Sequence, residues 1–293
     1  MADRFDSIFR SGLFDGSVVL VTGGGTGIGR CTAHELAALG ANVVIGGRRR
    51  EVLDGTAEEI GRAGGKCDVV ELDIRNQEMV DSVVAAVASK HGRIDGLFNN
   101  AGGQFFALAE DLSPNAWRSV VDLNLNGTFL VSAAVYRQSM AEHGGAIVNM
   151  LADIWTGYPG MAHMSAARAG IENLSMTLSL EWARKSIRVN CVAPGTVMSS
   201  GIVTYPEEVQ KRTAAEGSIN PSGRLGTESE VSAAVVFLLS PAAAYITGET
   251  LKIDGGARFQ KGRFIQFKAH NRTARFDGFH LRPDFRGTPF EDV

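Results

Sequence analysis

The residues best suited to chemistry begin with a group of glycines near the N-terminus. Residues 22–29 read Thr-Gly-Gly-Gly-Thr-Gly-Ile-Gly and directly follow an apolar run. Glycines at this spacing allow a tight turn and let the backbone approach a pyrophosphate, which then lies at the N-terminus of the next helix. The segment therefore predicts a dinucleotide site whose contacts come from Gly23, Thr26, Gly27, Ile28 and Gly29.

A second group of residues indicates which dinucleotide binds. Residues 45–50 read Ile-Gly-Gly-Arg-Arg-Arg after the second apolar run. An NAD site usually has an acidic residue here, which accepts hydrogen bonds from the adenosine ribose. Arg48 can instead pair with a 2′-phosphate, whereas Arg49 and Arg50 could equally begin a solvated helix. The sequence therefore favours NADP(H) as the cofactor over NAD(H).

The elements that must position these residues alternate regularly between residues 17 and 256. Strands are predicted at the short apolar runs 18–21, 42–45, 69–72, 96–98, 146–150, 188–192 and 250–253. Helices are predicted between them, including 27–39, 77–91, 115–142, 162–183 and 228–239, and Ser113 with Pro114 is a typical start for the third of these. Such alternation predicts an α/β fold, a Rossmann-type doubly wound parallel sheet in a single domain covering residues 1–257.

Residues 258–293 form a C-terminal extension of different composition. They contain eight Arg or Lys, four Asp or Glu and seven Phe, without a regular period. Basic and aromatic side chains suit both protein interfaces and phosphate-bearing ligands. The extension is therefore interpreted as an irregular tail packed on its own or a neighbouring subunit, with a lid or an acyl-CoA site as the alternative.

Composition excludes several classes of protein. A net charge of −3 argues against a nucleic-acid partner, and three widely spaced cysteines argue against a metal site or a disulfide framework. The N-terminal residues lack the apolar run of a signal peptide, and no uncharged stretch reaches the roughly 20 residues that span a bilayer. We expect a cytoplasmic protein without a membrane partner.

Two further motifs make the chain resemble the short-chain dehydrogenase/reductase family. Residues 99–102 read Asn-Asn-Ala-Gly and residues 193–195 read Ala-Pro-Gly. The resemblance implies further cofactor contacts from Asn100, Ala101, Gly102, Pro194 and Gly195. It also places Asp73, with Ile74, at the position that hydrogen-bonds the adenine.

The resemblance fails at the catalytic residues, where the family has Tyr-x-x-x-Lys. Residues 164–168 read Met-Ser-Ala-Ala-Arg, so Met164 replaces the tyrosine and Arg168 the lysine. The family serine falls at Ala152 or Leu151, neither of which has a hydroxyl, whereas Asn124 matches the family asparagine. Arg168 could still hold the nicotinamide ribose, but a permanently charged guanidinium does not shuttle protons.

These departures are similar to those of a smaller group within the family. Residues 103–105, 142–149 and 166–170, together with His163, resemble the peroxisomal trans-2-enoyl-CoA reductases and, more distantly, the 2,4-dienoyl-CoA reductases, over residues 13–257. This resemblance implies reduction of the carbon–carbon double bond of an enoyl-CoA or related conjugated substrate. Hydride addition to such a bond creates an enolate, which needs hydrogen bonds or positive charge at the thioester oxygen.

The proton that completes this reduction has three candidate sources. Glu172 shares a helix face with Met164 and Arg168 and occupies the position of an acid proposed in the relatives; alternatively it forms a simple helix pair with Arg168, typically worth ~0.2–0.5 kcal/mol. Tyr158 could supply a phenol or form part of the pocket wall. His163 is interpreted as structural rather than catalytic. The predicted catalytic residues are Asn124, Arg168, Glu172 and Tyr158.

Other predictions concern the substrate, the assembly and two rival functions. Substrate contacts are expected from Gln104, Phe105, Trp155 and Met164, although apolar residues of this kind are more often plain core. The family resemblance implies a homotetramer built through helices 115–142 and 162–183 and the strand near Thr250. One rival is a carbonyl reductase or alcohol dehydrogenase that uses Tyr158 as a displaced acid. The other is a cofactor-binding relative without catalysis.

Overall fold

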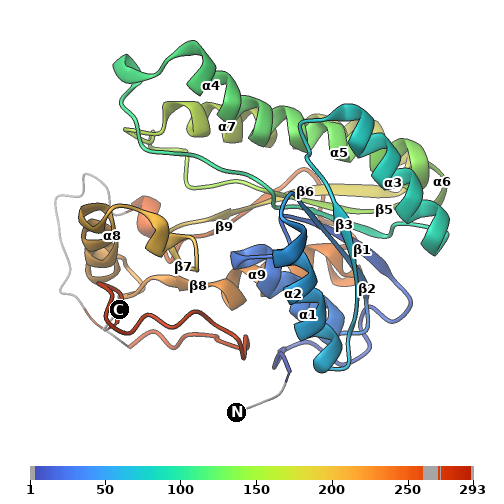
Figure 1. Ribbon diagram of the computed structural model, residues 1–293, viewed down its shortest axis with the longest axis horizontal. Coiled ribbons are helices and arrows are strands. Elements are labelled where there is room, and N and C mark those ends of the chain that lie inside the picture. The colour runs from blue at the N-terminus through green and yellow to red at the C-terminus, as the bar shows by residue number, and fades with distance from the viewer. Residues whose placement is uncertain (1–3, 260–269, 271, 292–293) are drawn as a thin grey trace.

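The computed structural model describes residues 4–259, 270 and 272–291, and its centre is a sheet of seven parallel strands. The spatial order of the strands is β3-β2-β1-β4-β5-β6-β9 (Figure 1). Their bounds are β1 Val18–Thr22, β2 Asn42–Gly47, β3 Lys66–Glu71, β4 Gly96–Asn99, β5 Gly145–Met150, β6 Ile187–Pro194 and β9 Thr250–Ile253. The predicted doubly wound sheet is confirmed. The first three strands add outward from β1 to β3, and the later strands add on the other side of β1, so the strand order switches between β1 and β4.

Each face of the sheet carries its own hydrophobic core, because successive side chains of a strand point to opposite faces. Val19 and Val21 of β1 face the core under α1 (Gly27–Ala38), α2 (Arg50–Arg62) and α9 (Glu228–Leu239). Val18 and Leu20 face the core under α3 (Gln77–His91), α5 (Gly127–Val135) and α7 (Ala162–Trp182). Burial on both faces explains why these strands are continuous apolar runs in the sequence.

The helix expected at residues 115–142 is a rod of several pieces. α4 (Pro114–Val121) starts with the predicted cap, in which Ser113 Oγ accepts from the Ala116 amide at 3.2 Å. The π-helical turns η2 (Asp122–Asn126) and η3 (Tyr136–Met140) separate α4 from α5 and α5 from the short α6 (Ala141–His143). π turns are frequent at functional sites, and η2 contains Asn124.

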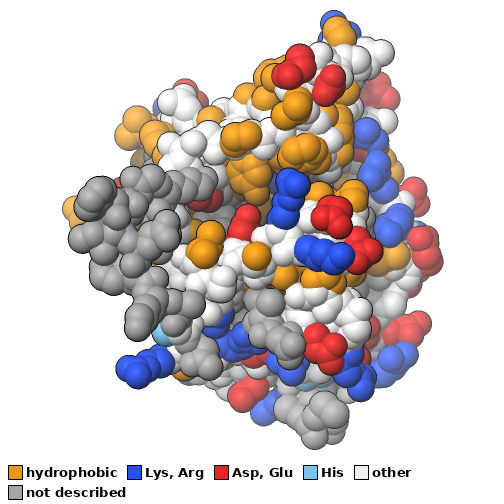
Figure 2. All heavy atoms as spheres, turned by 90° about the vertical axis from the view of Figure 1, so that its left-hand side faces the viewer, with side chains coloured by type: hydrophobic (Ala, Val, Ile, Leu, Met, Phe, Trp, Pro, Cys, Tyr) orange, Lys and Arg blue, Asp and Glu red, His pale blue; other side chains and the backbone are white. Residues whose placement is uncertain are grey.

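A smaller group of elements lies at the carboxyl end of the sheet. β7 (Val197–Met198) pairs with β8 (Gly226–Thr227), and α8 (Glu207–Ile219) lies between them in sequence. None of these three elements was predicted from the sequence. Figure 2 views this end of the molecule, where apolar side chains gather in the upper half and charged side chains become frequent below.

The described part of the C-terminal extension packs on its own domain. The Phe279 ring is buried with Phe5 and Cys31, and the Phe290 ring is buried with Met198, Ile202, Ala214 and Leu225. Backbone bonds reinforce this path, since the Asp6 amide donates to Gly278 O at 2.9 Å. Residues 260–269, 271 and 292–293 of the extension lie outside the described residues.

Candidate active site

The glycine turn between β1 and α1 has the geometry that its sequence predicts. Gly23 and Gly27 have φ angles of +66° and +57°, a region in which other residues are strained. A Cβ atom at Gly29 would collide with the carbonyl oxygen of Gly23 and the side chain of Asn100. The turn is therefore as tight as glycine alone permits, and the start of α1 lies close to the ends of β1 and β4.

The N-terminus of α1 is suited to an anion. Thr26 is the N-cap residue, and its hydroxyl makes no capping bond within the described structure, while the first turn contains no acidic residue. Amide groups in the first turn of a helix lack partners inside the helix and attract negative charge. These amides can therefore bind the pyrophosphate of a dinucleotide.

Asn100 and Thr22 fix this turn to the neighbouring strand. Asn100 Nδ2 donates to the carbonyl oxygens of Thr22 and Gly23 at 3.0 and 3.1 Å. The Thr22 hydroxyl oxygen accepts from the amides of Asn100 and Ala101 at 3.1 and 3.0 Å. The Asn-Asn-Ala-Gly motif thus positions the glycine turn through hydrogen bonds between the ends of β1 and β4.

A cavity of about 180 Å³ extends from this turn along the end of β2. It brings together many of the residues predicted to bind the cofactor: Gly23, Thr26, Arg48, Asp73, Ile74, Ala101 and Gly102 all line it. Arg48 is exposed at its rim, directly after β2. Asp73 is bound by Arg75 at 2.9 and 2.5 Å, and these hydrogen bonds lower the pKa of its carboxyl group.

The remaining predicted cofactor residues lie on the same edge of the sheet. Gly27, Ile28 and Gly29 form the start of α1, and Pro194 ends β6. Gly195 follows at once and donates from its amide to Ile253 O at 2.9 Å. A tight glycine cradle, a helix N-terminus without a side-chain cap and a cationic rim lie along one edge, so these residues fit a nicotinamide dinucleotide.

Arg168 and Asn124 meet beneath the loop that follows β4. A Cβ atom at Gly102 would lie 2.5 Å from Arg168 Nη2 and 2.6 Å from Asn124 Oδ1. Asn124 is fully buried, and its amide donates to Gly103 O and Val120 O, both at 2.8 Å. Asn124 therefore ties the π turn η2 to the loop at Gly103, and Gly102 leaves the space that Arg168 fills.

Arg168 is a buried cation at the carboxyl end of β5. Its side chain is 6% exposed, and Nη1 donates to Met150 O at 2.5 Å. Burial lowers the pKa of Arg168 to about 10, which still leaves the guanidinium charged at neutral pH. A full positive charge with few water neighbours acts strongly on nearby negative charge, because the local dielectric constant is low.

The position of the family tyrosine is apolar in the structure. Met164 is buried with Val120 and Met161, and Ala152 and Tyr205 pack against this cluster. Two of the predicted substrate residues contact neighbours of this cluster. Gln104 Nε2 donates to the Tyr205 hydroxyl at 3.1 Å, and the Phe105 ring packs edge-on against the His163 ring with 4.6 Å between the ring centres. Trp155 lies under Lys252 Nζ of β9, 4.1 Å from the ring centre.

Two predicted acids occupy different surroundings. Glu172 Oε1 accepts from the Thr250 hydroxyl at 3.0 Å, which directs its carboxylate toward β9. Tyr158 is 41% exposed in the loop after β5, and partial burial of its phenol raises its pKa. A raised pKa makes the phenol less ready to release a proton, so Tyr158 is a weaker acid here than in water.

Two buried polar atoms near the site have no hydrogen-bond partner among the described residues: His163 Nε2 and Asp153 Oδ1. His163 Nδ1 accepts from the Met164 amide at 2.9 Å, so a neutral ring carries its proton on Nε2. Asp153 had not been singled out in the sequence, because an acid in a loop between a strand and a helix is usually solvated.

A buried polar network beneath the site was not predicted from the sequence. Asn99 Nδ2 donates to Ser132 Oγ and Asn149 Oδ1, and Asn149 Nδ2 donates to Ser175 Oγ, each at 2.8 Å. These bonds connect β4, α5, β5 and α7 below the residues that face the cavity. A fully bonded buried network of this kind fixes the relative positions of its elements.

No helix in the described ranges is long and apolar enough to cross a bilayer, and no cluster of three or more His, Cys, Asp or Glu side chains there is arranged to hold a metal ion. The cysteines Cys31, Cys67 and Cys191 are free thiols.

Known proteins with similar sequences and structures are oxidoreductases, as a nicotinamide cofactor site would suggest. Residues 23–258 match a family described as enoyl-(acyl carrier protein) reductase. The chain is 38% identical to the probable 2,4-dienoyl-CoA reductase of Bacillus subtilis over 81% of this chain and 95% of that protein. It is 35% identical to the 3-oxoacyl-(acyl-carrier-protein) reductase of Thermotoga maritima over 83% and 98%. A solved citronellol catabolism dehydrogenase of Pseudomonas aeruginosa is 49% identical, with a TM-score of 0.78 and coverage of 86% and 99%.

Proposed function

Because the chain belongs to the short-chain dehydrogenase/reductase family, whose members bind nicotinamide cofactors, we propose that it is an NADP(H)-dependent reductase of conjugated double bonds. The substrate class is an enoyl-CoA, a dienoyl-CoA or a related conjugated thioester. Relatives named 2,4-dienoyl-CoA reductase or probable 2,4-dienoyl-CoA reductase support this substrate class.

The observation that carries the proposal is the pair formed by Met164 and Arg168. A thioether in an apolar cluster stands where a carbonyl reductase needs its proton donor, and a buried guanidinium stands where it needs a lysine. Reduction of an isolated carbonyl creates an alkoxide, which requires an acid at the oxygen. Conjugate reduction creates an enolate, which requires only hydrogen bonds or positive charge there.

The residues divide this work as follows. The bound nicotinamide supplies the hydride. Arg168 holds the nicotinamide ribose and contributes a positive charge beside the reacting carbons, while its bond to Met150 O fixes its orientation. Asn124 holds the loop at Gly103, because its Nδ2 donates to Gly103 O at 2.8 Å and its Oδ1 accepts from the Gly103 amide at 3.3 Å. Met164, Phe105 and Gln104 shape the acyl pocket, with Tyr205 as a neighbour that closes it.

The α-carbon receives its proton from a water molecule oriented near Glu172, in this proposal. The Thr250 hydroxyl occupies Oε1 of Glu172 and leaves Oε2 for such a water. The rival proton donor is Tyr158, which would favour carbonyl reduction. The relative named 3-oxoacyl-(acyl-carrier-protein) reductase supports this alternative reaction. General acid help of this kind is worth about 10²–10⁴-fold in rate.

A substrate panel tests the proposed reaction. NADPH oxidation is followed with an enoyl-CoA, a dienoyl-CoA, a ketone and an aldehyde under identical conditions. We expect the thioesters with a conjugated double bond to be reduced fastest. Faster reduction of simple ketones, or loss of all turnover in Tyr158→Phe, would assign the chain to the carbonyl rival. NADPH binding without oxidation by any of the four would favour a cofactor-binding protein without catalysis.

The cofactor preference leads to a prediction for Arg48. Arg48 lies at the rim of the cavity, where a 2′-phosphate would meet a guanidinium rather than an acid. We expect NADPH to bind at least several-fold more tightly than NADH, and Arg48→Ala to remove most of this preference. Calorimetry of both cofactors with both proteins measures the effect. Arg62→Ala is the control, because Arg62 pairs with Glu58 on the exposed side of α2; equal affinities in the wild type would contradict the assignment.

A homotetramer is proposed for the assembly. Met176 and Leu180 of α7 are exposed apolar side chains, as are Phe129 of α5 and Leu251 of β9. Apolar side chains gathered on these elements are typical of surfaces that subunits cover. Light scattering at micromolar concentration should give the mass of four chains, whereas a monomeric mass would contradict the proposal. A cytoplasmic location stays a prediction from the sequence.

A further inference from the structure

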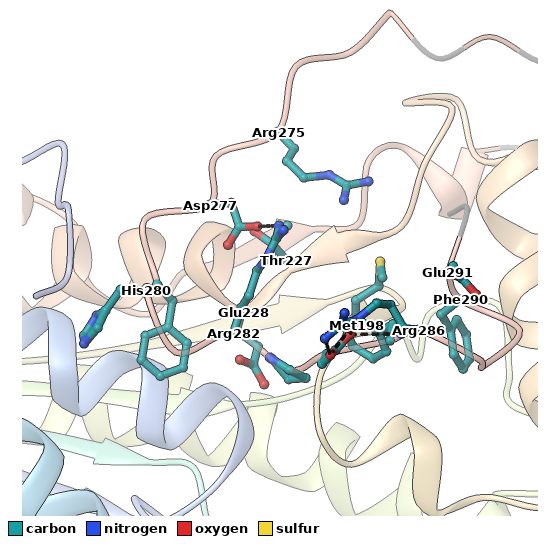
Figure 3. A pocket seen from close by; sticks show the side chains of 14 residues that line it. Met198, Thr227, Glu228, Arg275, Asp277, His280, Arg282, Arg286, Phe290 and Glu291 are labelled. Carbon is teal, nitrogen blue, oxygen red and sulfur yellow. Dashed lines mark hydrogen bonds and ion pairs between the residues drawn. The ribbon is translucent and has the colours of Figure 1, made fainter. Parts of the chain in front are cut away.

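The first turn of α9 contains a carboxyl group that the reaction described above does not use. Glu228 is 4% exposed and lines a cavity of about 440 Å³ between β7, α9 and the C-terminal extension (Figure 3). The other charged residues of this cavity belong to the extension, and two pairs among them bind each other: Arg282 with Asp277, and Arg286 with Asp284. Glu228 has no such partner among them.

One oxygen of Glu228 is left without a hydrogen bond. The backbone of Ser200 hydrogen-bonds the carboxyl group, whereas Oε1 is buried and has no partner among the described residues. Oε1 lies 3.9 Å from the position that a Cβ atom at Gly27 would take. Gly27 is the first residue of α1, so the unpartnered oxygen lies close to a helix end of the kind that binds phosphate.

The charge state of Glu228 follows from its surroundings. Burial raises the pKa of its carboxyl group to about 7, and Asp277 of the extension raises it as well. The hydrogen bond from the Ser200 backbone and the charge of Arg30 on α1 oppose this rise in pKa, and the Arg30 guanidinium is also bound to Glu59 at 2.7 Å. Cys31, also on α1, is buried near Glu228; burial raises the pKa of its thiol, which therefore carries no charge at neutral pH. At neutral pH a large part of Glu228 is therefore the neutral acid, which has one O–H to donate.

We propose that Glu228 is a cofactor-binding residue, whose protonated carboxyl group donates a hydrogen bond from Oε1 to the dinucleotide phosphate at the N-terminus of α1. This inference rests on the nucleotide site of the proposed function but not on its substrate. A neutral acid adds a donor to the amides of α1, whereas an ionised carboxylate at the same position repels the phosphate. Nucleotide binding then favours the protonated form and takes up a proton wherever the free protein has lost it.

The predicted consequence is a pH-dependent affinity for the nucleotide. At pH 6 most of the carboxyl group is protonated and affinity is nearly full, and affinity falls progressively as the pH rises through 7 and the group ionises. Linkage to one proton with a pKa near 7 weakens NADPH binding about tenfold between pH 6 and pH 8. The 2′-phosphate of NADPH also titrates, with a second pKa of about 6, but it does so equally for every protein variant.

The test is calorimetric titration of the full-length protein with NADPH between pH 6 and pH 8. Glu228→Gln keeps a donor that cannot ionise, so its affinity at pH 6 should stay near the wild-type value. Between pH 6 and pH 8 it should not show the tenfold loss of affinity that is expected for the wild type. Glu228→Ala should bind more weakly than wild type at pH 6, because the donor is lost. Asp284→Asn, an exposed carboxylate at the cavity rim that is paired with Arg286, is the control and should keep the wild-type pH profile.

Proton uptake gives a second measurement that needs no variant. Titrations in two buffers of different ionisation enthalpy at pH 7.5 should show that the wild type takes up protons as NADPH binds. Equal pH profiles for wild type and Glu228→Gln, or binding without proton uptake, would overturn the inference and leave the proposed reaction intact. Failure of NADPH to bind at any pH would overturn both the inference and the proposed cofactor.

Discussion

Arg168→Ala is expected to lower kcat/KM by at least about 100-fold and to weaken NADPH binding at the same time. Arg168 is the buried cation that holds the nicotinamide ribose in the proposed mechanism, and Gly102 leaves the space that its guanidinium occupies. Without it the hydride donor loses its orientation and the developing enolate loses a nearby charge. Steady-state kinetics with an enoyl-CoA and calorimetry with NADPH measure the two effects.

Two further variants separate this role from simple loss of structure. Arg168→Lys keeps the charge but loses the fork geometry, and it should fall between wild type and Arg168→Ala. Met164→Leu has a similar volume and is equally unable to donate a proton, so turnover should stay within a few-fold of wild type. Thermal denaturation checks that each variant is folded. A folded Arg168→Ala protein with wild-type NADPH affinity would contradict the assignment of Arg168 to the cofactor.

Phe290→Ala is expected to detach the end of the C-terminal extension from the domain. The Phe290 ring is fully buried among Met198, Ile202, Ala214 and Leu225, and the Phe285 ring lies 6.0 Å from it. Removal of a buried aromatic ring costs about 3–5 kcal/mol. Because the ring holds the extension on the domain, the free energy needed to detach the extension locally should fall by this amount. Amide hydrogen exchange of residues 276–291 should therefore become faster by roughly two to four orders of magnitude, as measured by mass spectrometry.

A phenylalanine from the same extension provides the matched control. Phe259 is 54% exposed and stacks under the Arg258 guanidinium at 4.1 Å. Phe259→Ala should cost about 1 kcal/mol or less, because a cation–π contact at an exposed site is weak. Equal exchange of residues 276–291 in both variants would show that Phe290 does not hold the extension in place.

Much of the fold was predictable from local sequence patterns. The seven apolar runs all became strands. Inner strands such as β1 are apolar because both of their faces are covered, whereas the edge strands β3 and β9 are only partly buried and also contain charged residues. The glycine turn was predictable for a similar reason, since the φ angles at Gly23 and Gly27 exclude other residues. The rod that starts at Ser113 was predicted as one helix, but the side chain of Asn124 bonds Val120 O where a π turn interrupts it.

The residue types of the active site were also readable, whereas their partners were not. The loss of the tyrosine and lysine is visible at Met164 and Arg168 in the sequence alone. That Arg168 bonds Met150 O, and that Glu172 accepts from Thr250 on another strand, depends on how α7 lies against the sheet. Spacing along a helix identifies which side chains share a face, but not what the opposite element presents to them.

The sequence by itself determined the order of the elements, the cofactor turn and the absence of the usual proton donor, because each is encoded within a few neighbouring residues. Only the tertiary structure decided where the C-terminal extension lies and that Glu228 reaches the first residue of α1. An acid in the first turn of α9 is an ordinary helix start when read locally. Its meaning changes because α9 and α1 pack against each other on the same face of the sheet, and contacts between distant segments leave no local pattern in the sequence.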